Sequence, residues 1–189
     1  SFALIASSRL SASAHAESMV KEGDVIAICG DSITEQKQYS VFMEDYLRMC
    51  QPAKVKVVQF GWGGETAQGF LVRQKDALSI NPTLATTCYG MNDGKYNAVS
   101  EEVQKAYREP LKKVVENFTN AGARVIVGSP GAVDFDTFKR NQTSEKIYNN
   151  NLATLGQEAK AIAEQTGQTY ADVITPMLKS MYDAKQALG

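Results

Sequence analysis

The sequence predicts an α/β fold in which helices cover both faces of a five-stranded parallel sheet. Short apolar runs, each too short for a helix, alternate with longer segments whose apolar residues recur at helical spacing. Strands that alternate with helices in this way form parallel sheets through right-handed crossovers. No linker, internal repeat or low-complexity tract interrupts the alternation. We therefore expect one domain with the architecture of a three-layer α/β/α sandwich.

Five segments are expected to form the strands. Residues 25–29 are a continuous apolar run bounded by Gly23 and Gly30, which is typical of a strand buried on both faces. The other strands are expected at 55–60, at 84–89, at 124–128 and, with a weaker pattern, at 169–173.

Helices are expected between and after these strands. Residues 101–120 carry apolar side chains at helical spacing, and Ala121-Gly122 supplies a signal for the end of the helix. The other helices are expected at 39–50, 67–78, 144–165 and 176–188. A flavodoxin-like strand order, 2-1-3-4-5, is expected. It places the first strand between the second and third, so the loops after these strands meet where open α/β sheets bind ligands.

Composition and charge exclude several functional classes. The length of 189 residues suffices for one well-buried domain, and a net charge of −1 with scattered Lys and Arg gives no electrostatic footprint for nucleic acid. No apolar stretch approaches the length of a membrane span. No phosphate-loop motif is present, the three cysteines form no CxxC pair, and the acidic residues near 134–145 are too loosely spaced for a metal. We therefore expect neither a metal nor a cofactor.

Residues 1–20 allow two interpretations. Residues 2–7 are modestly apolar and Ala14-His15-Ala16 has the small-x-small form of a signal-peptidase site, but Arg9 interrupts the apolar stretch and no basic region precedes it. The segment is expected to be either the remnant of an export signal, which implies a periplasmic or secreted protein, or an N-terminal arm of a cytoplasmic one. The single domain is expected at 21–189.

Three polar loops follow the first three expected strands: Gly30-Asp31-Ser32, Gly61-Trp62-Gly63-Gly64 and Gly90-Met91-Asn92-Asp93. Each has a structural interpretation when taken alone. Ser32 is a residue type that often caps a helix, the glycines suit a tight turn, and Asn92-Asp93-Gly94 suits another turn. Taken together, they supply a hydroxyl nucleophile, uncovered backbone N–H groups and an amide that can donate to an oxyanion.

The three loops resemble the motif blocks of the SGNH (GDSL-type) esterase and lipase family. Gly30-Asp31-Ser32-Ile33 resembles the first block, Gly61-x-x-Gly64-x-Thr66 the second and Gly90-x-Asn92-Asp93 the third. The resemblance implies that Ser32 is the nucleophile, and that the Ser32 and Gly64 amides and the Asn92 side chain donate to the oxyanion. The chain differs from the α/β-hydrolases, because no GxSxG elbow surrounds Ser32.

The resemblance also implies a small-molecule ester as the substrate, cleaved through an acyl-enzyme. A small acyl ester, first of all an O-acetylated sugar, is expected, while a lysophospholipid or a thioester stays open. Asp31, Trp62 and Tyr89 are expected on the substrate side of the site. Asp31 would help to fix the loop, and the two aromatic residues either line a substrate cleft or pack in the core.

One block of the family has no counterpart in this sequence. The Asp-x-x-His block that supplies the general base is missing, and the only histidine is His15. A serine hydroxyl is a poor nucleophile without a base. Three explanations stay open: the chain is a truncated form of an enzyme whose base lies after Gly189, it is a non-catalytic ligand- or carbohydrate-binding pseudoenzyme, or His15 supplies the base. The first is the expectation.

Overall fold

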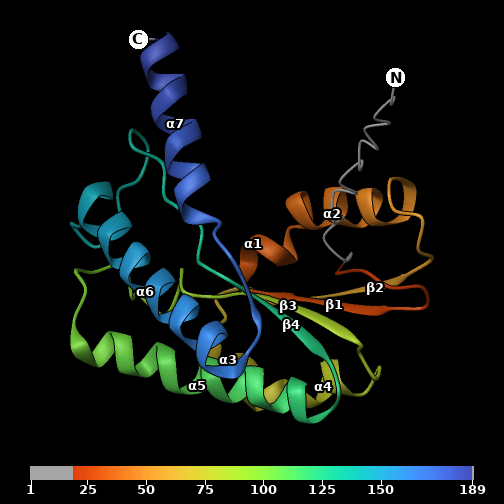
Figure 1. Ribbon diagram of the computed structural model, residues 1–189. Helices are drawn as coiled ribbons and strands as arrows, with labels where there is room; N and C mark the ends of the chain where they lie inside the picture. The colour runs from red at the N-terminus through yellow and green to blue at the C-terminus, as the bar shows by residue number, and fades with distance from the viewer. Residues whose placement is uncertain (1–18, 189) are drawn as a thin grey trace, which may run out of the picture.

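The computed structural model describes residues 19–188 and confirms the expected α/β/α sandwich (Figure 1). Five parallel strands form one sheet in the order β2-β1-β3-β4-β5. The interpretations that concern residues 1–18, including the export signal and His15, lie outside the described residues. The strands are β1 (Val25–Gly30), β2 (Lys56–Gly61), β3 (Leu84–Cys88), β4 (Arg124–Gly128) and β5 (Thr169–Ala171).

The helices form two layers, one on each face of the sheet, and one layer contains more helices than the other (Figure 1). Helices α3, α4, α5 and α6 cover one face of the sheet, where a large core joins Phe70, Tyr107, Phe118 and Leu155 to the strands. On the other face α2 packs over Ile26 and Ile28, in a smaller core. The helices are α1 (Ser32–Glu35), α2 (Gln38–Met49), α3 (Ala67–Arg73), α4 (Lys75–Leu78), α5 (Glu101–Asn120), α6 (Glu145–Thr166) and α7 (Ile174–Leu188).

The helices differ from the expectation in two places. The chain forms a separate turn of helix, α1, before α2, and the helix expected at 67–78 is interrupted at Gln74. The side chain of Gln74 is buried and donates to the Val114 carbonyl of α5, 2.8 Å away. Strand β5 is shorter than expected, because only residues 169–171 pair with β4 at the sheet edge.

The strand register determines where the loops of the candidate site begin. Gly30, the last residue of β1, pairs with Gly61 of β2 and with Cys88 of β3, so these strands end at the same level. The loops that follow them therefore start side by side at the carboxyl edge of the sheet. No helix within residues 19–188 is both long enough and apolar enough to cross a bilayer.

Candidate active site

Ser32 lies at the turn that leads from β1 into α1. Asp31, not Ser32, caps this helix: its Oδ1 accepts a hydrogen bond from the Ile33 amide at 3.0 Å. The capping interpretation of Ser32 is therefore wrong. Ser32 is half-buried, and within residues 19–188 its hydroxyl makes no hydrogen bond to another protein group. The hydroxyl is thus available to a ligand.

The loop after β2 approaches this turn closely. A side chain at Gly61 would place its Cβ 2.1 Å from the Glu35 amide of α1, so only glycine allows the two segments to pack. Gly64 has φ +70°, a backbone conformation that favours glycine, and nothing lies within 4 Å of the position that a Cβ would take. Gly64 is also exposed, so a ligand can reach its backbone, as an oxyanion donor requires.

Asn92 joins the three loops. Its Nδ2 donates to the Glu65 carbonyl at 2.9 Å, in the loop after β2. The same atom lies 3.5 Å from Asp31 Oδ2, in the loop after β1. The structure thus brings the first, second and third motifs together around the amide of Asn92, next to the residue that precedes Ser32.

The Glu65 side chain fixes the second loop through a partner that the sequence analysis missed. Arg73 donates to both Glu65 oxygens, at 2.5 and 2.7 Å, and to the Phe60 carbonyl at 2.9 Å. Glu65 is buried, and the Tyr89 hydroxyl also donates to it at 3.1 Å. The Glu65–Arg73 pair therefore holds the segment that carries Gly64 and the carbonyl that binds Asn92. The eight-residue spacing of this pair gives no signal in the sequence.

The two aromatic residues named from the sequence have different environments. Tyr89 is 1% exposed and stacks on Phe70, which agrees with the interpretation that it packs in the core. Trp62 is 61% exposed, and the Arg73 guanidinium lies over its ring at 5.5 Å. Trp62 is therefore the aromatic residue of the second loop that a substrate can reach. Asp31 is 2% exposed, so its carboxylate supports the loop from within.

Two carboxyl groups beside the site are shifted toward the neutral form. Burial raises the pKa of Asp93 to about 6, although the hydrogen bond that its Oδ1 accepts from the Ala67 amide at 2.9 Å acts to lower the pKa. Burial also raises the pKa of Asp31. No group of three or more His, Cys, Asp or Glu side chains within the described part of the chain could hold a metal ion.

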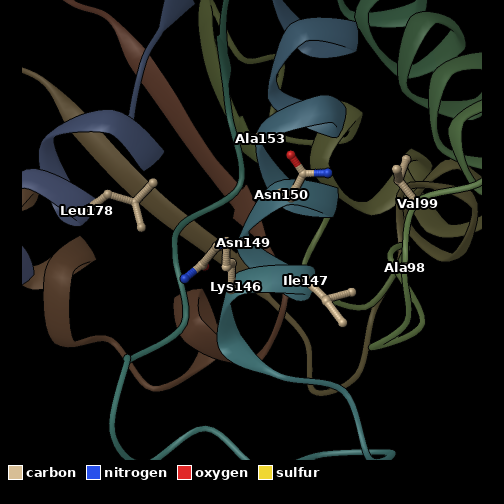
Figure 2. Close-up of a pocket in the computed structure, with 8 residues that line it drawn as sticks. All are labelled: Ala98, Val99, Lys146, Ile147, Asn149, Asn150, Ala153 and Leu178. Atoms are coloured by element: carbon tan, nitrogen blue, oxygen red, sulfur yellow. The ribbon is translucent and has the colours of Figure 1, made fainter.

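The described residues form several surface hollows, and two of them differ in their position relative to Ser32. Figure 2 shows one of about 690 Å³ between the segment of Ala98 and Val99, the start of α6 and Leu178 of α7, and none of the expected site residues lines it. The other, of about 610 Å³, is apolar and reaches from Ile33 beside Ser32 to Met177, over β3 and β4 and beside Met43 of α2.

The strand order and the three joined loops define an α/β protein with a candidate ligand site at the carboxyl edge of the sheet. The chain belongs to the GDSL-like lipase/acylhydrolase family, whose sequence model matches residues 28–188. The resemblance drawn from the motifs is thereby confirmed. No curated protein matches the chain.

Several solved structures share the fold. A gut microbial diltiazem-metabolizing enzyme matches with a TM-score of 0.76 and 23% identity, over 89% of this chain and 41% of that one. The acetylxylan esterase Axe2 from Geobacillus stearothermophilus matches with a TM-score of 0.72 and 18% identity, over 86% and 81%. LAE5, an α/β hydrolase from the metagenome of Lake Arreo, Spain, matches with 0.72 and 17%, over 86% and 83%.

The chain spans less than half of the first of these enzymes, at 41% of its length. Structures of catalytic mutants of Axe2, with an aspartate, a histidine or a serine replaced by alanine, also match. Histidine is absent from residues 19–188 of the present chain.

Proposed function

We propose that the protein is a serine esterase that hydrolyses small acyl esters through an acyl-enzyme on Ser32. The observation that carries the proposal is the position of Asn92, whose amide joins the loops of Asp31 and Glu65. An amide held there is suited to donate to a carbonyl oxygen attacked from the neighbouring Ser32. Membership of the acylhydrolase family supports the same reaction class.

In the proposed reaction, Ser32 Oγ attacks the ester carbonyl while its proton passes to a base. The carbonyl oxygen becomes an oxyanion, which accepts hydrogen bonds from the Ser32 and Gly64 amides and from Asn92 Nδ2. Collapse of this intermediate breaks the bond to the alcohol, which leaves with the proton. Water then releases the acid from the acyl-serine by the same steps. The base is not a histidine of residues 19–188, so we propose that it lies outside them.

The esterase proposal is tested by adding imidazole to the solution as a substitute for the missing general base. The chain of 189 residues is assayed with p-nitrophenyl acetate, with and without imidazole, beside Ser32→Ala. We expect little Ser32-dependent turnover in buffer and clear Ser32-dependent turnover with imidazole, because the added base takes the serine proton. The rate of the Ser32→Ala variant with imidazole measures the direct attack of imidazole on the ester, and this rate is subtracted from that of wild type. Equal rates for the two proteins with imidazole would contradict the esterase proposal.

The Asn92→Ala variant tests the oxyanion hole in the same assay. We expect kcat to fall on the order of a hundredfold with a smaller effect on KM, because the Asn92 hydrogen bond strengthens as the oxyanion forms. An unchanged kcat would assign Asn92 to a purely structural turn.

An O-acetylated sugar is the substrate that we propose first. The support is the exposed ring of Trp62 beside the Gly64 loop, together with fold neighbours that include an enzyme named as an acetylxylan esterase. The second candidate function is a non-catalytic binding protein, favoured by the absence of histidine from residues 19–188. Sugar binding without Ser32-dependent turnover in the imidazole assay would favour this candidate.

A further inference from the structure

The loop after β3 contains a backbone feature that the motif does not predict. Lys95 and Tyr96 both have positive φ values, +54° and +55°. Neither is a glycine, and two consecutive residues in this region are conformationally unfavourable. The surrounding structure must therefore hold them, and such strain is concentrated at functional sites.

The strained conformation directs the Tyr96 hydroxyl onto Asn92. Tyr96 Oη donates to Asn92 Oδ1 at 3.0 Å, while Asn92 Nδ2 donates to the Glu65 carbonyl at 2.9 Å. A carbonyl can only accept, so the nitrogen of the amide must face Glu65 and the oxygen must face Tyr96. The amide is thus bound at both ends, with one N–H on the Glu65 carbonyl, while the second N–H has only a long contact of 3.5 Å to Asp31 Oδ2 and can still donate to a ligand.

Tyr96 is itself held by residues far away in the sequence. The Arg140 guanidinium lies 3.9 Å from the centre of its ring, and the Tyr148 ring stacks on it at 5.1 Å. Helix α6 supports the same loop: the Tyr148 hydroxyl donates to the Met91 carbonyl, and Asn151 Nδ2 donates to the Gly94 and Asn97 carbonyls at 3.0 and 2.8 Å. Helix α6 and Arg140 therefore fix the position from which Tyr96 reaches Asn92.

We propose that Tyr96 is a positioning residue of the oxyanion hole, whose hydroxyl orients the Asn92 amide toward the oxygen of the substrate. The inference rests on the proposed function and extends it to a residue outside the three motif blocks. Tyr96 does not touch the substrate in this scheme. Its effect on the reaction passes through Asn92.

The kinetic test uses Tyr96→Phe, which keeps the ring and its stacking and removes only the hydroxyl. In the assay with imidazole we expect kcat to fall about three- to tenfold with KM little changed, as loss of one neutral hydrogen bond implies. The matched control is Tyr46→Phe, which also removes one tyrosine hydroxyl, but one that accepts from Gln51 Nε2 at 3.2 Å at the end of α2 and is not part of the loop of Asn92. This control should keep more of the activity than Tyr96→Phe.

A double-mutant cycle separates positioning from general support of the loop. If Tyr96 acts through Asn92, Tyr96→Phe has no further effect on kcat when Asn92 is already alanine. The same fold-loss in both backgrounds would overturn the proposal, as would an equal loss in Tyr46→Phe.

An NMR measurement tests the same proposal without depending on turnover. In ¹⁵N-labelled protein, the side-chain amide signals of Asn92, assigned by their absence from Asn92→Asp, should shift in Tyr96→Phe and stay close to wild type in Tyr46→Phe. Unchanged signals in Tyr96→Phe overturn the positioning role. If wild type lacks Ser32-dependent turnover while the signals shift as expected, the esterase proposal fails and the contact between Tyr96 and Asn92 stands.

Discussion

Asp93 is the residue of the third motif that the proposed chemistry leaves unused, and its burial makes it sensitive to pH. Its Oδ1 accepts from Ala67, whereas its Oδ2 has no hydrogen-bond partner among the described residues. Burial raises its pKa from 3.8 to about 6, so the folded state binds this proton more tightly than the unfolded state does. The stability gained from that proton is complete below about pH 4 and is lost as the pH rises through 6.

Asp93→Asn is predicted to remove this dependence. The amide oxygen can still accept from Ala67, and no charge is buried at neutral pH. Relative to wild type, the variant should gain stability between pH 4.5 and 7.5, on the order of 2 kcal/mol. Urea unfolding of both proteins at several pH values measures the difference. Parallel pH curves for the two proteins would show that Asp93 has an ordinary pKa in the folded state.

Trp62 provides a signal for substrate binding, because it is the only tryptophan in the chain. If sugar rings bind beside Gly64, its fluorescence should change on titration with acetylated xylooligosaccharide. The Trp62→Phe variant, which loses the fluorophore and part of the ring surface, should bind more weakly by calorimetry. A fluorescence spectrum unaffected by the sugar, together with unaltered calorimetric affinity in the variant, would remove Trp62 from the substrate site.

At the scale of helices and strands, the interruption at Gln74 ties α3 and α4 to α5. Gln74 is 1% exposed, and it accepts from Asn117 Nδ2 at 2.9 Å in addition to its bond to Val114. Gln74→Ala leaves these buried groups without partners and should destabilise the protein by about 1–3 kcal/mol. The melting temperature should fall by about 5 °C. Gln68→Ala, at an exposed position of α3, is the matched control and should melt within about 2 °C of wild type.

The same elements show what could be predicted from the sequence. The strands were predictable because short apolar runs such as residues 25–29 are typical of buried strands. The location of Ser32, Gly64 and Asn92 at one edge of the sheet was predictable because each follows a strand within a short motif. The division at Gln74 depends on Val114 and Asn117, some 40 residues away, which no local pattern encodes. Arg73 and Tyr96 were missed for the same reason, since their roles depend on tertiary contacts.

Over the whole molecule, the two faces of the sheet are unequally supported. Helix α6 buries a continuous face that includes Leu152, Leu155 and Ile162, and it adjoins α5 in the large core. On the other face α2 buries only Ser40 fully, and α7 only Ile174. Figure 1 shows α7 extending away from the sheet. Stability should therefore be concentrated in β1, β3, β4, α5 and α6.

Hydrogen exchange is predicted to reveal this asymmetry. Amides in the centres of α5, α6 and the inner strands should exchange only through global unfolding, because opening them exposes the large core. Amides in the second half of α7 should exchange orders of magnitude faster through local opening, although the helix has 15 residues, because few of its side chains are buried. Exchange measured by mass spectrometry in low denaturant separates the two classes. Protection of α7 equal to that of α6 would show that α7 unfolds together with the large core, contrary to the exposure of its side chains.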